Sequence, residues 1–323
     1  MLGHIKIVCG PNILSTIFNA VLPLFALILV GYVSAKKRIL GSEAVDVLNR
    51  FVVWLALPAL LFQAMAKATV EQIHQPGYIV ASLGAIAIIF VISWLWDWKS
   101  RKRRLAEISM EGLCSSYANS GYMGIPLCVI ALGQDSLPAV VINILMTACV
   151  LFAFSIVLIE IDRNGKGSLR RTAAGVGMSL LKNPLVMSPV AGAIVAVSQV
   201  PMPSFVFQFT SLLSAAASPC ALVTIGLFLA HSQPSGGSKL VSRIVFLKLV
   251  LHPLIVFVLV RWVFDMPLLW ANTAILLAAL PVGTGPFMLA KLYDLEPAMS
   301  SRAILISTVL SVVSLSVLVS IVA

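Results

Sequence analysis

Charged side chains are scarce in this sequence. Only 11% of its 323 residues are Asp, Glu, Lys or Arg, and 60% are hydrophobic, whereas soluble domains carry about 25% charged residues. So few charges cannot cover a surface in contact with water, which excludes soluble enzymes, nucleic-acid-binding proteins and disordered proteins. The mean hydropathy of +1.03 points the same way. The composition predicts an all-α, polytopic membrane protein.

Signatures of catalysis, nucleotide binding and metal binding are also missing. The sequence has no H-E-x-x-H, no G-x-S-x-G and no P-loop, and its five cysteines form no C-x-x-C pair. The scattered cysteines indicate neither a disulfide framework nor a zinc site. We therefore expect no enzyme, no cofactor and no metal, and we expect any transport to be driven by gradients.

Ten apolar stretches follow one another along the chain, and one membrane span needs about 20 apolar residues. The stretches are 12–35, 46–66, 77–98, 107–133, 137–160, 183–199, 204–231, 241–264, 269–292 and 298–322. The first is too long for the apolar region of a signal peptide and runs directly into Lys-Lys-Arg. The sequence therefore predicts ten spans, the first of which enters from outside.

The net charge of +10 is concentrated in loops that follow stretches 1, 3, 5 and 7. The basic residues are Lys36, Lys37 and Arg38; Lys99, Arg101, Lys102, Arg103 and Arg104; Arg163, Lys166, Arg170 and Arg171; and Lys239 with Arg243. Basic loops stay on the cytoplasmic side of a membrane. We expect a protein of the cell's inner, or cytoplasmic, membrane with both termini outside, and an interfacial helix at 168–181.

Proline and glycine recur at half the chain length. Pro23 and Pro184, Gly31 and Gly192, Pro58 and Pro219, and Gly124 and Gly285 are each 161 residues apart, and Pro126 and Pro286 are 160 apart. Five spans per copy, an odd number, force the second copy to be inverted in the membrane. We expect one repeat at 1–163, a cytoplasmic linker at 164–182 and an inverted repeat at 183–323.

Spans 4 and 9 are interrupted in their middles by glycine and proline. The candidate site residues are Asn119, Ser120, Gly121, Gly124 and Pro126 in span 4, and Pro281, Gly283, Thr284, Gly285 and Pro286 in span 9. Such residues unwind a helix, and irregular backbone at membrane depth is tolerated only where protein or a water-filled cavity covers it. We expect the two breaks to meet, with a half-helix starting at Pro126 and another at Pro286.

Two half-helix N-termini that meet in the membrane attract anions, because each carries about half a positive charge. No Asp or Glu lies within the breaks, and the nearest are Glu111, Asp135 and Asp294. A carboxylate ligand would balance this field. The alternative is that the glycines and prolines only kink two helices to ease packing.

Lys248 and His252 lie four residues apart in span 8, on one helical face. Lys248 either attracts an anionic substrate, pairs with Glu111, or extends to the cytoplasmic interface; His252 is either a packed residue or a proton relay. Ser307, Ser311 and Ser314 form a stripe on span 10 that serves helix packing or lines the substrate path.

Several strings together resemble the auxin efflux carrier family, which includes plant auxin carriers and bacterial permeases named for malonate and malate. They are A-L-P-A-L-L-F at 56–62, N-S-G-Y-M-G-I-P-L at 119–127, K-N-P at 182–184 and the Lys248 to Pro253 segment. The resemblance implies ten spans in a five-plus-five inverted repeat with crossed, discontinuous helices 4 and 9. That fold is similar to bile-acid symporters and sodium/proton antiporters, with elevator-like alternating access.

The resemblance also implies an organic anion held at the crossover, where Asn119 matches the family's binding asparagine. Span 9 has Val282 and Gly283 at the corresponding place, so contacts there would fall to Thr284 and backbone amides. Only about 20 residues link spans 5 and 6, which fits a compact bacterial permease rather than the many plant members with a long loop.

The sequence as a whole predicts a secondary carrier for a small carboxylate such as malonate or malate. Spans 1, 2, 6 and 7 would form a scaffold, and the other six a transport domain. The alternatives are a cation antiporter, which would need a membrane-buried Asp or Glu, an auxin-like carrier of aromatic carboxylates, and a membrane-embedded sensor or enzyme. The expected partners are the carboxylate and the lipid bilayer, without nucleic acid; a homodimer, the direction of transport and the coupling ion are left open.

Overall fold

The computed structural model describes residues 21–69, 74–98, 103–164, 169–199, 202–231 and 238–322. Within these ranges the chain is helical apart from short connections and one isolated antiparallel bridge between Ala118 and Val282. The predicted all-α class is confirmed. The first residues of stretch 12–35, as far as residue 20, and Lys99, Arg101, Lys102 and Lys166 lie outside the described residues.

Helix covers part of every predicted apolar stretch. In the first half the helices are α2 (Leu22–Lys36), α3 (Glu43–Phe51), α4 (Leu57–Ala66), α6 (Pro76–Trp98), α7 (Leu105–Ser116), α8 (Ile125–Leu132), α9 (Leu137–Leu145) and α10 (Phe152–Asn164), followed by α11 (Leu169–Lys182). In the second half they are α12 (Pro184–Ser198), α13 (Ser204–Ala215), α14 (Ala217–His231), α15 (Ser238–Phe246), α16 (His252–Val258), α17 (Leu268–Ala279), α18 (Gly285–Tyr293) and α19 (Pro297–Val322).

Short helical turns of other types continue several of these helices. They are the π turns η1 (Val52–Ala56), η2 (Ser120–Gly124), η4 (Met146–Leu151), η6 (Leu247–Leu251) and η7 (Leu259–Val263), and the 3₁₀ turn η3 (Gln134–Ser136). Among the described residues, six continuous helices are long and apolar enough to cross a membrane. There are seven if 173–182 and 184–198, which are bent by 66°, count as one span. The protein is therefore a multi-pass membrane protein.

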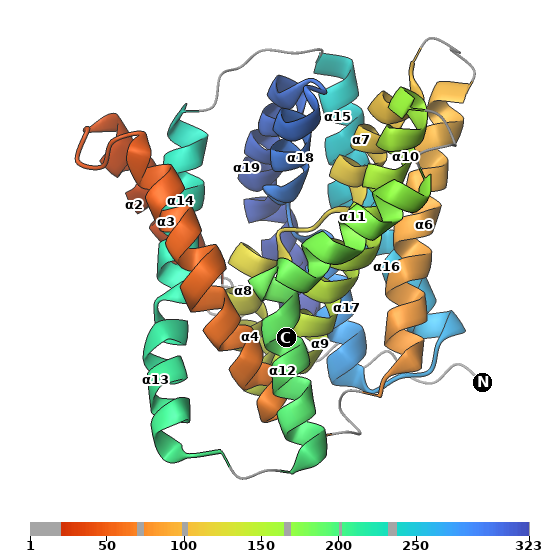
Figure 1. The fold of residues 1–323 in the computed structure, drawn as a ribbon. Coiled ribbons are helices and arrows are strands. Elements are labelled where there is room, and N and C mark those ends of the chain that lie inside the picture. The colour runs from red at the N-terminus through yellow and green to blue at the C-terminus, as the bar shows by residue number, and fades with distance from the viewer. Residues whose placement is uncertain are drawn as a thin grey trace.

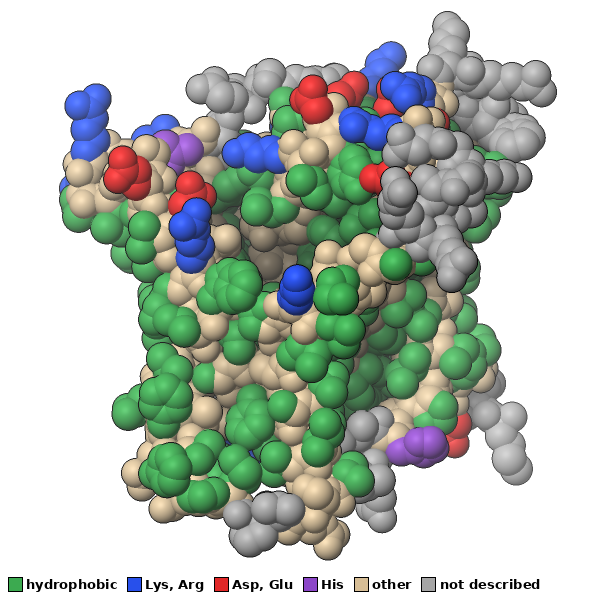
Figure 2. Space-filling model, in the orientation of Figure 1, with side chains coloured by type: hydrophobic (Ala, Val, Ile, Leu, Met, Phe, Trp, Pro, Cys, Tyr) green, Lys and Arg blue, Asp and Glu red, His purple; other side chains and the backbone are tan. Residues whose placement is uncertain are grey.

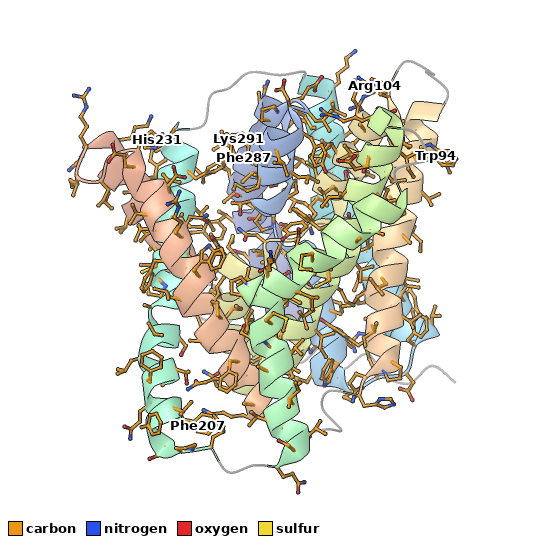
Figure 3. All side chains as sticks on the ribbon, in the orientation of Figure 1. Trp94, Arg104, Phe207, His231, Phe287 and Lys291 are labelled. Carbon is orange, nitrogen blue, oxygen red and sulfur yellow. The ribbon has the colours of Figure 1, made fainter. Side chains whose placement is uncertain are left out.

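Most of the charged side chains visible in Figure 2 lie at one end of the molecule. Figure 2 shows Lys, Arg, Asp and Glu at the top of the view, above a band covered mainly by hydrophobic side chains. Arg104, His231 and Lys291 lie at this end, and Phe207 lies at the opposite end (Figure 3). We refer to the end with Arg104 and Lys291 as the basic end.

The helices pack as two groups. In the first group α2 packs on α14, and α4 packs on α12 and α13; in the second, α7 packs on α6 and α10, and α19 packs on α15, α17 and α18. Figure 1 shows α2, α3, α13 and α14 on the left of the view and α6, α10 and α16 on the right.

Glycines allow the closest helix contacts of the first group. A Cβ at Gly31 of α2 would overlap the Val223 carbonyl of α14, and a Cβ at Gly226 of α14 would overlap the Ile28 carbonyl of α2. A Cβ at Gly192 of α12 would overlap the Phe62 carbonyl of α4. Small residues let helices approach in this way where lipid supplies no hydrophobic driving force. Gly31 and Gly192, 161 residues apart, therefore each allow the close approach of two helices.

Candidate functional site

The first break separates α7 from the helical chain that follows it. α7 ends at Ser116, Tyr117 is extended, and helical backbone resumes at Ser120 as the π turn η2, which continues into α8. The N–H groups of Met123 and Gly124 both donate to the Asn119 carbonyl, each at 3.0 Å. The α-helix α8 begins at Ile125, within one residue of the predicted start at Pro126, and the π turn η2 extends helical backbone back to Ser120. A wide turn before the proline accommodates its missing N–H.

The second break separates α17 from α18. Leu280 is extended, and α18 begins at Gly285 with Pro286 in its first turn, so the predicted start at Pro286 is confirmed to within one residue. In an unbroken helix the Val282 N–H would donate to the Ala278 carbonyl. Instead the Val282 N–H donates to Ser307 Oγ at 3.0 Å, and Lys248 Nζ donates to the Ala278 carbonyl at 2.6 Å.

The two breaks meet, as the sequence predicts. The Asn119 N–H donates to the Pro281 carbonyl at 3.0 Å, and the Gly283 N–H donates to the Tyr117 carbonyl at 3.1 Å. These two bonds flank the bridge between Ala118 and Val282. A Cβ at Gly283 would lie 2.8 Å from the Tyr117 ring and 3.1 Å from the Ala118 carbonyl, so glycine favours the close approach of the two backbones there.

A cavity of about 550 Å³ opens beside the paired breaks, between the two helix groups. We call it the central cavity. Its lining includes five of the predicted site residues, namely Asn119, Ser120, Gly121, Thr284 and Gly285. The first helix group contributes Asp46, Asn49, Arg50 and Trp54 near the start of its second apolar stretch, and Asn183 before α12. Since α3 begins just after the α2–α3 turn at the basic end, the cavity extends toward that end.

Asn119, which lines the central cavity, has a buried side-chain donor without a partner in the described part of the chain. Its residue is 4% exposed, and its Nδ2 has no hydrogen-bond acceptor among the described residues. A buried polar group without a partner is uncommon in native structures and indicates an absent ligand or water. The neighbouring Ser120 Oγ, by contrast, donates to Asn143 Oδ1 at 2.8 Å.

Two helix N-termini give this cavity a positive character, and Arg50 and Asp46 add one charge of each sign to its wall. The first residues of η2 and α18 line it, and their backbone N–H groups lack partners within their own helices. Arg50 is exposed on the cavity wall, and Asp46, one turn earlier on α3, lines the same wall. Tyr122 Oη of η2 donates to Asn49 Oδ1, which holds the end of α3 against the break.

The other predicted site residues lie outside the central cavity. Gly124 is buried, and a Cβ there would lie 2.7 Å from Leu277. Pro126 lines a second cavity of about 670 Å³. Pro281 supplies the carbonyl to Asn119, and Pro286 is buried in the first turn of α18. They shape the breaks rather than line the cavity.

Lys248 extends inward rather than to the cytoplasmic interface, so that alternative is wrong. Its side chain is fully buried, and Nζ lies 2.6 Å from the Ala278 carbonyl and 3.3 Å from His252 Nδ1. Lys248 does not line the central cavity. Ser307, in the predicted serine stripe, contacts the second break through Val282.

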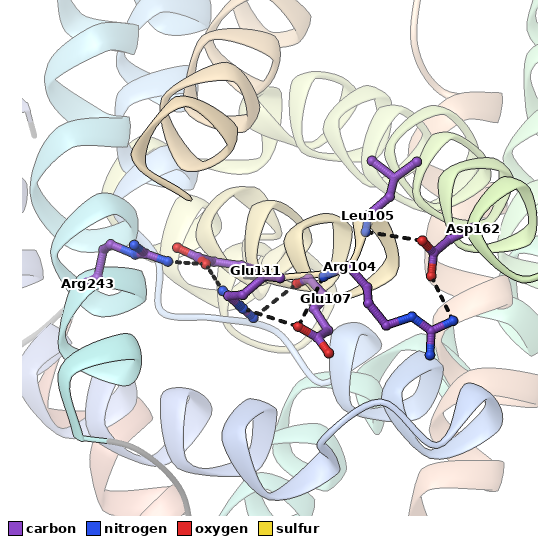
Figure 4. A network of polar contacts seen from close by, with 7 residues as sticks. Arg104, Leu105, Glu107, Glu111, Asp162 and Arg243 are labelled. Carbon is purple, nitrogen blue, oxygen red and sulfur yellow. Dashed lines mark hydrogen bonds and ion pairs between the residues drawn. The ribbon is translucent and has the colours of Figure 1, made fainter. Parts of the chain in front are cut away.

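Glu111 lies in a separate ionic network at the basic end, shown in Figure 4. Its Oε2 lies 2.5 Å from Arg103 Nη1 and also accepts from Arg243, and the glutamate side chain is fully buried. Next to it, Arg104 pairs with Asp162 at 3.1 Å, and the Leu105 N–H donates to the same aspartate. The network connects α7 with α10 and α15. Glu111 thus has two arginine partners that the sequence did not indicate.

Comparisons with known proteins indicate the family of the chain. A family model described as "Membrane transport protein" matches residues 16–319. The chain belongs to this family. It is similar to a Rhizobium meliloti (strain 1021) protein named "Putative malonate transporter", with 30% identity over 303 residues, which are 94% of this chain and 95% of the relative.

Two further relatives extend the range of the family. "Uncharacterized transporter YfdV" of Escherichia coli (strain K12) is 26% identical over 237 residues, or 72% of this chain and 74% of that protein. "Auxin efflux carrier component 5" of Arabidopsis thaliana is 28% identical over 155 residues, or 47% of this chain and 43% of that protein. The resemblance of this membrane transport protein to the auxin efflux carriers is confirmed.

Arg50 is the main cavity residue of this transport protein that the sequence analysis missed. It lies inside the apolar stretch predicted at 46–66, and a cation within a membrane span commonly faces a cavity or a substrate path. The position of Arg50 inside an apolar stretch could therefore have identified it as a candidate cavity residue. Within the described ranges, no cluster of three or more His, Cys, Asp or Glu residues could hold a metal ion.

The second cavity borders α8, which contributes Ile125, Pro126, Val129 and Ile130 to its lining. It is lined by Gln63 and Lys67 of the first helix group, by Asp135 near the start of α9, and by Ser211 and Ser218 of α13 and α14. The α4 residues Leu57 and Leu61 face the central cavity, whereas Leu60 and Ala64 face the second one. Two cavities therefore lie along α4, one beside the paired breaks and one beside α8.

Proposed function

We propose that this protein is a secondary carrier that binds a small organic anion in the central cavity. The observation that supports this most strongly is the buried Asn119 Nδ2, which lacks an acceptor and lies beside two helix N-termini. A carboxylate oxygen is the complementary ligand, because it accepts hydrogen bonds and carries the charge that such helix ends favour.

The proposed substrate is a dicarboxylate such as malonate or malate. One carboxylate would accept from Asn119 and the amides at the start of η2 or α18, and the other would pair with Arg50 of α3. Arginine suits this role because its planar guanidinium binds carboxylate in a bidentate manner. The name of the Rhizobium relative supports the same substrate class.

An aromatic carboxylate is the second candidate substrate. The central cavity is larger than malonate requires, and Tyr117, Tyr122, Trp54 and Phe152 contribute ring surfaces to it. Such walls suit a ligand with an apolar body and one polar group. The similarity to an auxin efflux carrier component supports this candidate.

The proposed architecture has ten spans in two inverted repeats, 1–163 and 183–323, joined by a linker at 164–182. The packing supports it: α2 of the first half packs on α14 of the second, and α12 of the second packs on α4 of the first. These pairs correspond if span 1 matches span 6 and span 2 matches span 7. In both pairs a glycine of the matched set, Gly31 or Gly192, is at the closest contact.

The proposed mechanism is elevator-like alternating access. The helix group of α2, α3, α4, α12, α13 and α14 would stay fixed as the scaffold, and the group that carries the breaks would move past it. The positive-inside rule places the basic end in the cytoplasm and both termini outside. The protein would lie in the inner membrane, and the central cavity would face the cytoplasm in this structure.

Uptake of labelled malonate into proteoliposomes tests the proposal, with unlabelled malate, acetate and indole-3-acetate as competitors. A dicarboxylate carrier should be saturable, with malate competing much better than acetate. Stronger competition by indole-3-acetate than by malate would favour the aromatic candidate. Absence of saturable uptake of every carboxylate, in protein shown to be folded, would refute the proposal.

A further inference from the structure

Lys248 lies in one of the most deeply buried positions of the protein. It lies in η6, between α15 and α16, and its residue has no exposed surface. Its Nζ donates to the Ala278 carbonyl at 2.6 Å and lies 3.3 Å from His252 Nδ1. A charged amine at such a place is costly unless something balances its charge.

The partner of Lys248 is an acceptor that the second break sets free. Because α17 stops at Ala279, the Ala278 carbonyl loses the Val282 N–H, which goes to Ser307 instead. Lys248 and Ser307 thus replace the two halves of one missing helical hydrogen bond. A neutral hydroxyl is enough for Val282, whereas the carbonyl receives a group that is cationic when protonated.

Helix ends supply partial negative charge in the region of Lys248, beginning with the Ala278 carbonyl at the end of α17, which accepts from its Nζ. Beside His252 is a cavity of about 10 Å³, lined by Ser82, Ser116, Asn143, Thr147 and the end of α17, with no carboxylate among its lining residues. Ser116 is the last residue of α7, so the C-terminal ends of both broken half-helices face this region. Each such end carries about half a negative charge, and two together balance roughly one monovalent cation.

We propose that the Lys248 ammonium is a tethered counter-cation for the two broken spans. When protonated it supplies from within the chain the single positive charge that the two carbonyl ends favour, so the site binds its organic anion without a co-transported sodium or potassium ion. This inference rests on the proposed carrier function. It makes Lys248 a positioning residue, because it acts on the break through Ala278 and not on the substrate.

Substitution of Lys248 should therefore make transport depend on an added cation. We would measure labelled malonate uptake by wild type, Lys248→Met and Lys248→Arg in media with sodium, potassium, methylammonium or choline as the cation. Wild type should vary by less than about twofold among the media. Lys248→Met should lose about tenfold in choline, since a buried carbonyl loses its donor, and should recover with the small cations.

Two controls separate a cation site from general damage. Lys248→Arg keeps the charge and should stay indifferent to the medium. Lys291→Met removes an exposed lysine of α18 that lies over the Phe287 ring, and it should behave as wild type. The proposal is overturned if folded Lys248→Met is equally impaired in every medium, or if wild type itself requires sodium or potassium.

Thermal unfolding in detergent tests the same inference without transport. At constant ionic strength, sodium, potassium or methylammonium in place of choline should raise the Tm of Lys248→Met and leave that of wild type unchanged. Equal responses of the two proteins would overturn the inference. If wild type moves no carboxylate, the carrier function fails, and the Tm comparison still decides whether Lys248 occupies a cation site.

Discussion

Substitution of Asn119 by Ala should weaken anion binding without unfolding the protein. The backbone of Asn119 donates to the Pro281 carbonyl and accepts from Met123 and Gly124, and alanine keeps all of these bonds. Only the side-chain amide is lost, and its Nδ2 has no acceptor among the described residues. The structure therefore predicts a large effect on substrate and a small one on stability.

The size of the effect follows from the bond that is removed. A hydrogen bond to a charged group contributes about 1.5–3 kcal/mol, which corresponds to a roughly 10- to 150-fold weaker affinity. Asn119→Asp should be worse, because it places a carboxylate where the substrate carboxylate binds. The assay is the concentration dependence of malonate uptake, with Tm in detergent measured in parallel.

Asn272→Ala is the matched control for this prediction. Asn272 is also buried, at 8% exposure, but its side chain accepts from Arg261 and donates to the Val322 carbonyl, away from the central cavity. We expect Asn272→Ala to lower Tm and leave KM unchanged. A KM for Asn119→Ala within twofold of wild type would refute the assignment of Asn119 to the site.

Three further substitutions test other parts of the account. Arg50→Gln should raise the KM for malonate by about tenfold or more and the KM for acetate much less, because only a second carboxylate needs the guanidinium. Equal changes for both acids would contradict this role. Arg50→Lys should keep part of the preference for malonate. Gly226→Ala should lower the free energy of unfolding by about 1–3 kcal/mol, because the added Cβ would overlap the Ile28 carbonyl. The control Gly175→Ala, in the open part of α11, should be neutral or slightly stabilising. Equal Tm values for the two variants would contradict the packing of α2 on α14. Glu111→Gln should lower the free energy of unfolding by about 3–5 kcal/mol, because two arginines lose a buried carboxylate. Glu107→Gln, at a more exposed position, should lower it by at most about 1 kcal/mol. Similar Tm values for the two variants would show that the Glu111 network contributes little to stability.

The breaks could be predicted from the sequence because glycine and proline act locally. The second break lies where the cluster of Gly283, Gly285 and Pro286 predicts it. The first break lies before Gly121 and Pro126 instead of among them. The π turn η2 accommodates Pro126 within helical backbone there. Whether a proline is accommodated by a wide turn or leaves an open break depends on the side chains that pack around it.

The partners of the charged residues could not be predicted in the same way. Lys248 binds a backbone carbonyl 30 residues away, and an orphan acceptor at Ala278 exists only once the helix is known to stop there. Glu111 meets Arg243, 132 residues away, because α7 and α15 pack together. Arg50 reaches the cavity because α3 contacts η2 through Asn49 and Tyr122. All three depend on tertiary packing.

The central claim is that an organic anion binds where the two breaks meet. Cryo-electron microscopy of the protein saturated with malonate tests it most directly. The account predicts ligand density in the central cavity within hydrogen-bond distance of Asn119 Nδ2, beside the first residues of η2 and α18. Malonate density confined to another part of the protein, or spans 4 and 9 running unbroken through this region, would contradict the account.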